Sequence, residues 1–415
     1  KGNTTAAHGQ WGRAGGFLII GVTLQSLITS ESTMYKNKIA CTLLTPIALA
    51  LLSAPVSAAI TLYDEDGTTF SADGYVNAFY VQTDTDNIND DLDRDQARVK
   101  MGFLPNYIGF NMGKDMGDLT LGARSSFWVT INDSETNGTA TAIDVRQFYG
   151  TIGGDWGEVL VGKDFGLFAR SNILLDEMLA GYGQVSDTLG VSFGNIGSGY
   201  PYPFPTAQIT YRSPVMGGLR VAAGIMDPVD TSDDSAVGKN YQDAPRFETE
   251  VTYQFDLAGA DIYSWVNAGY QTSKNTDSTV DDVTSQGFGY GVQAKMGALS
   301  LTASGFDAEG INPFFTNNAG EAVLREVDST GHLLQGSYTF GGKTRLALSF
   351  GKTEDDGNGL GVAADYETRA IGLFHSINEH LTLVAEYNQF EIEDRTNSVT
   401  IEETDSVALG VALSW

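Results

Sequence analysis

Cysteine, histidine and basic residues are all scarce in this chain. Its 415 residues include one cysteine, four histidines and 24 Lys or Arg residues against 52 Asp or Glu residues, and the formal net charge is −28. A single cysteine excludes an intrachain disulfide, so packing and hydrogen bonds must hold the fold. The acidic excess argues against nucleic acid as a partner, because the phosphate backbone requires the opposite charge.

The scarcity of histidine also argues against an enzyme. After residue 58 the sequence has only His332, His375 and His380, and none of them lies near a nucleophile motif of the kind that a membrane hydrolase needs. The acidic segment 84–95 lacks the Gly and the terminal Glu of an EF-hand, so we interpret it as a solvated loop and not as a cation site. We therefore expect no catalytic residues, no metal and no cofactor.

Long apolar runs are missing after residue 58, and the run before it is short. Basic residues at 34–38 precede a mostly apolar stretch at 39–53, which small residues at 54–58 end. This order is typical of a secretory signal peptide cleaved after Ala58. A retained anchor helix is the alternative, but Pro46 interrupts a stretch that is already short for a membrane span.

Three segments follow from this interpretation. We expect 1–33 to be an upstream or non-native segment, 34–58 to be the signal peptide and 59–415 to be the mature chain. Cys41 falls in the signal peptide, far from the cleavage site, and is not a lipoprotein cysteine. The mature chain then has no cysteine, 20 basic residues against 51 acidic ones, and a net charge of −31.

What the chain has in abundance is alternation with a period of two. In the closing segment, Val407, Leu409, Val411, Leu413 and Trp415 alternate with small residues. Alternation of this kind is typical of strands with one apolar face. It recurs at 119–130, 219–225, 246–255, 345–350 and 381–388.

The connections between the alternating segments are of two kinds that follow one another along the chain. Seven are short, at 114–118, 153–157, 213–218, 256–261, 296–298, 341–343 and 376–380. Eight are long and mostly acidic, at 84–95, 132–140, 164–205, 227–245, 274–285, 307–330, 354–361 and 391–403. Fifteen connections join sixteen strands.

This pattern predicts an all-β fold, a 16-stranded antiparallel transmembrane β-barrel with short periplasmic turns and long external loops. Lipid offers no hydrogen-bond partners, so a sheet within it must close and leave no edge. Sixteen strands also leave room for an aqueous channel. The closing segment would turn its apolar face to lipid and place Trp415 in the interfacial belt. A secreted two-sheet sandwich is the alternative, but it gives no reason for the unequal loops.

Several motifs of the mature chain resemble those of the Gram-negative general-diffusion porins. They are AITLYDEDG at 59–67, RQFYGTIGGDWG at 146–157 with VGKDF at 161–165, and TYRSP at 210–214 with Gly217 and Gly218. The resemblance spans the mature chain and depends on the order and spacing of the motifs. It implies an outer-membrane location, an infolded third loop, and a homotrimer in contact with outer-membrane lipid and lipopolysaccharide. It also implies passive diffusion of ions and small hydrophilic solutes.

The longest connection, 164–205, would be the constriction loop. Its segment DEMLAGYG at 176–183 resembles the family's constriction motif, with Glu177 at the first acidic position and Gly181 in place of the second. On the facing wall, Lys100 and Arg146 match members of the family's basic cluster. The predicted pore-constriction residues are Asp176, Glu177, Asp187, Arg98, Lys100, Arg124, Arg146 and Lys163. The alternative is that these are ordinary charges of a water-filled lumen.

The acidic loops lead us to expect a cation-preferring pore. An outer-membrane adhesin or receptor barrel with acidic external loops is the alternative function. Residues 200–205, of sequence YPYPFP, could be an aromatic slide for sugars or a stiff, extended exit from the constriction loop. We place Gln147 and Thr151 on the outward face of the fourth strand, where they would meet another subunit.

Overall fold

The computed structural model describes residues 59–132, 143–185, 192–229, 231, 237–317 and 326–415. In this part of the chain the elements are β-strands, apart from the 3-10 turn η1 (Asp90–Leu92) and the short helix α1 (Arg170–Leu174). None of the helices described is long and apolar enough to cross a membrane. The predicted segments 1–33 and 34–58 and the predicted site residue Asp187 lie outside the described residues.

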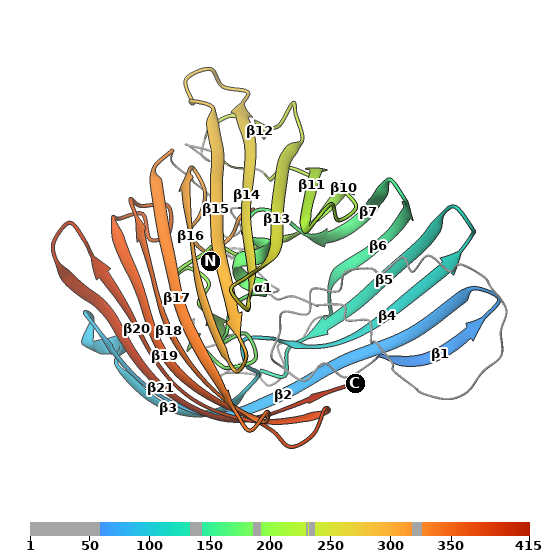
Figure 1. Ribbon diagram of the computed structural model, residues 1–415. Helices are drawn as coiled ribbons and strands as arrows, with labels where there is room; N and C mark the ends of the chain where they lie inside the picture. The colour runs from blue at the N-terminus through green and yellow to red at the C-terminus, as the bar shows by residue number, and fades with distance from the viewer. Residues whose placement is uncertain (1–58, 133–142, 186–191, 230, 232–236, 318–325) are drawn as a thin grey trace, which may run out of the picture.

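The strands form a closed antiparallel barrel, which confirms the predicted fold class. Each wall strand pairs with the next along the chain, and β21 pairs with β2, so the described wall has sixteen strand positions (Figure 1). The wall consists of β2 (Thr68–Asn87), β3 (Arg94–Lys100) with β4 (Asn106–Asp115), β5 (Thr120–Val129), β6 (Asp144–Gly154), β7 (Gly157–Phe165), β10 (Pro205–Arg212), β11 (Leu219–Met226), β13 (Arg246–Leu257), β14 (Ala260–Asn275), β15 (Val283–Met296), β16 (Leu299–Glu309), β17 (Asp328–Phe340), β18 (Thr344–Asp355), β19 (Ala364–Ser376), β20 (Leu381–Asp394) and β21 (Val399–Ser414).

Four short strands of the described chain lie beside these positions. β1 (Ile60–Glu65) pairs with the first residues of β2. It lies on the same edge of β2 as β21, and it begins where the pairing with β21 ends. β12 (Asn240–Tyr241) pairs with β14, and β8 (Gln184–Val185) pairs with β9 (Ser192–Gly194) inside the barrel. The turn between β1 and β2 has positive φ at Asp66 and Gly67, as a two-residue hairpin turn requires.

The barrel closes where the C-terminal residue meets β2. The N–H of Trp415 donates to the carbonyl of Gly74 at 3.1 Å, and the N–H of Gly74 donates back at 2.9 Å. The indole of Trp415 lies across Gly74, in the space that any side chain at that position would fill. Position 74 must therefore be glycine, because the Trp415 indole packs against it where a side chain would otherwise lie.

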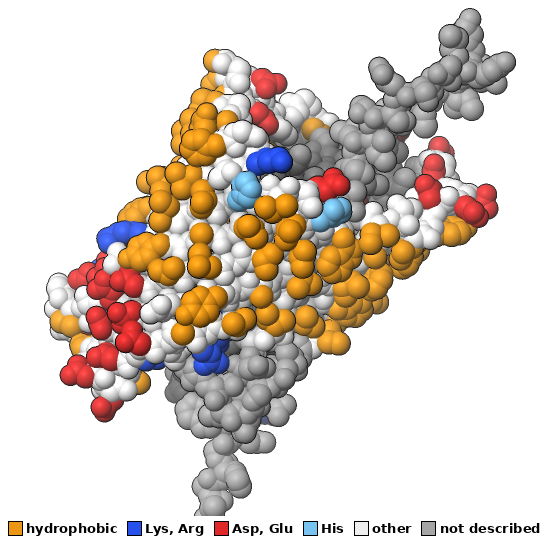
Figure 2. Space-filling view, turned by 90° about the horizontal axis from the view of Figure 1, so that it is seen from below, with side chains coloured by type: hydrophobic (Ala, Val, Ile, Leu, Met, Phe, Trp, Pro, Cys, Tyr) orange, Lys and Arg blue, Asp and Glu red, His pale blue; other side chains and the backbone are white. Residues whose placement is uncertain are grey.

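The outer face of the barrel is apolar and the inner face is mostly small, polar or charged. Along β21, Leu409 is 55% exposed, whereas its inward neighbour Ala408 is fully buried. Figure 2 shows one side of the outer face, where hydrophobic side chains spread across the middle and acidic ones gather toward the ends. This is the distribution that a lipid-facing barrel needs.

The inner and outer faces of β6 correct one sequence-based placement. Gln147 is buried and bonds to lumen side chains, while its neighbour Phe148 is 63% exposed on the outer face. Thr151 pairs with Gly122, which shares the inward phase of Arg124, so it faces the lumen too. The prediction that Gln147 and Thr151 face another subunit was wrong by one residue, because the register shift between Ser126 and Phe127 changes the phase of β6.

The second wall strand is broken at 101–105, between β3 and β4. Asn77 on β2 replaces the lost ladder partners, since its side chain accepts from the N–H of Gly102 at 2.6 Å and donates to the carbonyl of Leu104 at 2.6 Å. Phe103 is fully buried, and its N–H donates to the carbonyl of Gly181 at 2.9 Å. The wall thus bends inward until it touches the loop that crosses the lumen.

Candidate functional site

The loop between β7 and β10, residues 166–204, folds into the barrel, and we call it the constriction loop. Its start is fixed to β13, where the carboxylate of Glu248 accepts from the N–H groups of Leu167 and Phe168 at 2.5 and 2.9 Å. On β14, the side chain of Asn267 accepts from the N–H of Ala169 at 2.9 Å. Wall side chains thereby replace the backbone partners that a loop at this depth would otherwise lack.

The tip of the constriction loop is held by a second wall carboxylate. Glu386 on β20 accepts from the N–H groups of Tyr182 and Gly183 at 2.8 and 2.7 Å. A side chain at Gly181 would collide with this carboxylate. The acidic residue that the family motif has at that position is therefore missing because an acid from the barrel wall occupies the space.

Glu177 is an anchor of the constriction loop and does not line an open passage. It is buried, and its carboxylate accepts from the hydroxyls of Ser300 at 2.5 Å and Ser337 at 3.0 Å. Arg345 on β18 donates to this carboxylate at 3.3 Å and to the backbone carbonyl of Glu177 at 2.7 Å. These donors from the barrel wall compensate the negative charge of the Glu177 carboxylate.

Asp176 is also enclosed by donors. Its carboxylate accepts from Gln335 at 2.6 Å, Asn195 at 2.8 Å and the hydroxyl of Tyr200 at 2.5 Å. Burial raises the pKa of the Asp176 carboxyl, while these hydrogen bonds act in the opposite direction. Asp176 joins the outgoing and returning halves of the constriction loop to β17, so its role in the geometry is structural.

The predicted basic residues fall into three environments. Arg98 and Lys100 face inward on β3, where they pair with the buried Val81 and Phe79 of β2. Lys163 lies on the outward face of β7, directly opposite Phe148 and Ala207. The structure therefore brings Arg98 and Lys100 to the lumen and places Lys163 outside it, because the phase of β7 alternates inward at even positions.

Arg124 and Arg146 both lie inside the barrel and both have acidic partners. Arg124 donates to Asp73 at 2.9 Å and to Gln147 at 2.8 Å. Arg146 donates to Asp144 at 2.7 Å, and its guanidinium lies 5.0 Å from the ring of Trp128. Neither cation is available as an isolated charge.

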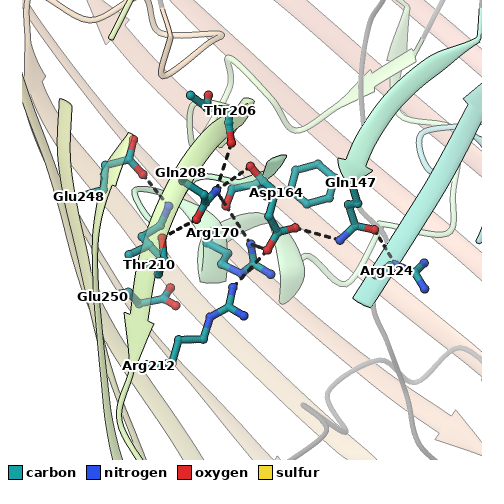
Figure 3. A network of polar contacts seen from close by, with 12 residues as sticks. Arg124, Gln147, Asp164, Arg170, Thr206, Gln208, Thr210, Arg212, Glu248 and Glu250 are labelled. Carbon is teal, nitrogen blue, oxygen red and sulfur yellow. Dashed lines mark hydrogen bonds and ion pairs between the residues drawn. The ribbon is translucent and has the colours of Figure 1, made fainter. Parts of the chain in front are cut away.

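A second polar network on the same side of the lumen was missed by the sequence reasoning (Figure 3). Asp164 at the end of β7 accepts from Gln147 at 2.9 Å and from Arg212 at 3.1 Å, and it lies 3.5 Å from Arg170 of α1. Arg212 also reaches Glu158 at 3.2 Å. The inward phase of β7 and β10 could have identified Asp164 and Arg212, but the position of Arg170 depends on the fold of the loop.

Two charged side chains of this network are only partly covered, although Asp164 between them is buried. Glu158 is 33% exposed and Arg170 is 19% exposed, although both lie inside the barrel. Arg220 on β11 faces the same space and forms no ion pair within 4 Å with a described residue. This partly exposed, charged face extends over β5 to β11.

A second loop also folds inward and covers the constriction loop. The N–H of Tyr202 donates to the carbonyl of Phe314 at 2.9 Å, and the N–H of Thr316 donates to the carbonyl of Tyr202 at 3.0 Å. Tyr200 and Tyr202 are fully buried. Of the two readings of 200–205, the structure favours the stiff exit, because buried rings cannot act as a slide for sugars.

Within the described residues no group of acidic, histidine or cysteine side chains could hold a metal ion. His375 lies 2.8 Å from the Thr344 hydroxyl, and His380 bonds to the carbonyl of Ser414 at 3.0 Å. No carboxylate among the described residues bonds to His375, so the third group that would orient such a base is missing there.

Comparison with known proteins gives consistent results for the sequence and the fold. A family model described as Gram-negative porin matches residues 44–395. Outer membrane protein U of Vibrio parahaemolyticus serotype O3:K6 (strain RIMD 2210633) is 25% identical over 337 residues, which cover 78% of this chain and 85% of that protein.

Two solved structures share the architecture. The outer membrane channel DcaP of Acinetobacter baumannii has a TM-score of 0.65 at 15% identity, and the match covers 86% of this chain and 100% of that one. The anion-selective porin from Comamonas acidovorans has a TM-score of 0.62 at 14% identity, with 84% and 100% covered. At these identities the likeness concerns the fold alone.

Proposed function

The chain belongs to the Gram-negative porin family, and from this premise we infer an outer-membrane channel for passive diffusion that prefers cations. The family and the closed barrel support the diffusion channel. The observation that carries it in this structure is the partly exposed, charged wall of β5 to β11 beside the constriction loop. Such a wall needs water, and a barrel of this size can hold it.

The proposed cation preference rests on the external loops. Carboxylates cluster at the external side of β2, β3 and β21, where Asp84, Asp86 and Asp95 are exposed and their cross-strand neighbours Glu403 and Asp405 are half-buried. A negative rim concentrates cations before they reach the lumen. Because Asp176 and Glu177 are enclosed by donors, the rim and not the constriction loop must supply the preference in this proposal.

A planar-bilayer recording with purified protein tests the function directly. We expect stable conductance steps and, in a tenfold KCl gradient, a reversal potential of cation-selective sign. Conductance with an anion-selective sign would remove the cation preference and leave the channel. The absence of conductance would favour the alternative, an adhesin or receptor barrel that displays its acidic loops.

We further propose that the protein is not an enzyme. His332 packs near Phe350 on the outer face, and His380 contacts a backbone carbonyl and Glu379. His375 contacts the Thr344 hydroxyl, but no carboxylate among the described residues bonds to His375 to orient it as the base of an activated nucleophile. Release of fatty acid from phospholipid by the pure protein would contradict this proposal.

We propose a homotrimer that contacts neighbouring copies through its low wall. β10 and β11 have 8 residues each and β7 has 9, whereas β14 and β21 have 16. Strands of 8 or 9 residues are short for a bilayer, so another subunit would cover this side, while lipid and lipopolysaccharide would surround the taller one. Cross-linking in native membranes, with a ladder ending at three copies, is the expected result.

Processing after Ala58 remains our proposal for the N-terminal segments. The small residues at 54–58, which end the apolar stretch, and the family-like sequence that starts at Ala59 support it. The intact mass of protein from outer membranes should correspond to residues 59–415, and the presence of Cys41 would contradict the proposal.

A further inference from the structure

A small cavity lies beneath the tip of the constriction loop, at the end of the barrel that carries the short turns. Its volume is about 60 Å³, and Ala180 of the loop forms one side of it. The other sides belong to the barrel wall, from β17 through β21 to β2. The cavity is separate from the charged wall of β5 to β11, and none of the predicted site residues lines it.

The charged side chains that line the cavity are all positive. Two of its lining residues, Lys343 and Arg345, are cationic, and none is acidic. Hydroxyl groups make up most of the remaining polar lining; they belong to Tyr75, Thr339, Ser376, Thr382 and Ser414. The apolar part includes the ring of Phe374, over which the Arg345 guanidinium stacks at 4.1 Å.

Both cations have capacity for a further acceptor. The Lys343 ammonium lies in the turn between β17 and β18, and no ion pair joins it to a described residue. Arg345 donates through Nη1 to Glu177, but its Nε is buried and has no hydrogen-bond partner among the described residues. A buried donor without an acceptor is costly, so an anion that satisfies it is stabilised.

We propose that this cavity binds the carboxylate end of small hydroxylated anions that enter from the periplasmic side. The carboxylate pairs with Lys343 and Arg345, and the hydroxyls of the solute meet the hydroxyls of the wall. Since about 10–15 Å³ measured in this way is enough for one water, the cavity has room for a small charged group, and the remainder of the solute extends into the lumen. The inference rests on the proposed channel, because it assumes that solutes reach this end of the lumen.

The position of Arg345 connects the cavity to the constriction loop. The same guanidinium lines the cavity and holds both the carbonyl and the carboxylate of Glu177. A bound carboxylate competes with Glu177 for that guanidinium. The solute also lies against Ala180, three residues before Gly183, whose N–H donates to Glu386. Occupancy should therefore interrupt the current, since the bound anion both fills the lumen edge and loosens the loop contact.

Single-channel recording with D-glycerate as the probe tests the proposal, and glycerol serves as the neutral control with the same number of carbons. We expect D-glycerate to cause brief closures when added on the periplasmic side, and glycerol to cause none at the same concentration. Lys343→Gln should weaken the apparent affinity by about tenfold or more, as expected for the loss of a hydrogen bond to a charged group. Lys114→Gln is the matched control, because it removes a lysine from the same end of the barrel without touching the cavity.

Titration calorimetry of the detergent-solubilised protein measures D-glycerate binding independently of conductance. Binding that Lys343→Gln weakens and Lys114→Gln preserves would support the site. Conducting channels on which D-glycerate and glycerol act alike, or calorimetry with no difference between the two lysine variants, would overturn it and leave the channel intact. Failure to conduct would instead count against the proposed function, while the calorimetry would still decide about the cavity.

Discussion

The guanidinium of Arg345 holds Glu177 at two points, its backbone carbonyl at 2.7 Å and its carboxylate at 3.3 Å. Both residues are buried, and they come from different parts of the fold, β18 and the constriction loop. The contact fixes the loop to the wall near the end of the barrel that carries the short turns. It also explains why the acidic residue that best matches the family motif is not free to act on passing ions.

Arg345→Met should detach this part of the constriction loop. Removing one partner of a buried ion pair leaves the other charge uncompensated, which costs about 3–5 kcal/mol. We expect a lower unfolding temperature of the detergent-solubilised protein and noisier open-channel current. The double variant with Glu177→Gln should lose less stability than Arg345→Met alone, because no unpaired charge remains; an equal loss would show that the pair is not the anchor.

Gly181→Ala should disturb the tip of the constriction loop. The added methyl group would collide with the Glu386 carboxylate, which must then leave the N–H groups of Tyr182 and Gly183. Overpacking of this kind costs about 1–3 kcal/mol. Thermal unfolding should detect the loss, and Gly150→Ala, where an added methyl group comes no closer than 3.6 Å to its nearest neighbour, is the control for the substitution itself.

Asp164→Asn should shift the ion preference of the pore toward anions. Asp164 is the shared partner of Arg170 and Arg212, so its neutralisation leaves two lumen arginines with less compensation. The reversal potential in a KCl gradient should move in the anion-selective direction. Asp243→Asn, which removes an exposed carboxylate paired with Lys274 in an external loop, is the control for total charge. Equal shifts in the two variants would mean that the network does not act on the current.

Neutralising the external rim should weaken the proposed cation preference in a salt-dependent manner. Asp84→Asn, Asp86→Asn and Asp95→Asn together remove exposed charges beside the mouth. The Debye length is about 10 Å at 0.1 M salt and about 3 Å at 1 M, so the effect on the reversal potential should be larger in dilute KCl. Asp176→Asn with Glu177→Gln should alter stability more than selectivity. The opposite ranking would return the constriction loop to the role that the family motif implies.

Gly74→Val should impair assembly of the barrel. The valine side chain would occupy the face on which the Trp415 indole lies, at the point where β21 closes on β2. We expect less of the folded, heat-modifiable band on unboiled gels, as for deletion of Trp415. Ala78→Val, at an outward position further along β2, is the matched control. Normal folding of Gly74→Val would show that the closure tolerates displacement of the indole.

The alternation of residue types was enough to predict the wall of the barrel. An inward position must be small or polar and an outward one apolar, because lipid lies on one side and water on the other, and this constraint acts on every second residue. Closure, sixteen strand positions and the sidedness of the loops follow from local sequence. In β6 the phase fails where an extra residue enters at Arg146, since a bulge reverses the faces that follow it.

The interior was decided by tertiary structure. The sequence predicts Asp176 and Glu177 as acidic residues of the constriction. Their partners Gln335, Ser300 and Arg345 lie more than a hundred residues away in the sequence, and only closure of the barrel brings those strands to the loop. Gly181 stands where the family motif has an acidic residue, and in the folded chain the Glu386 carboxylate of β20 occupies that space. The sequence by itself determined which residues face lipid in every strand of regular phase, because that choice depends on a local period, whereas the bulge of β6 escaped it. Only the folded chain determined which charges remain for solutes, because each buried charge is compensated by whatever the distant wall presents to it.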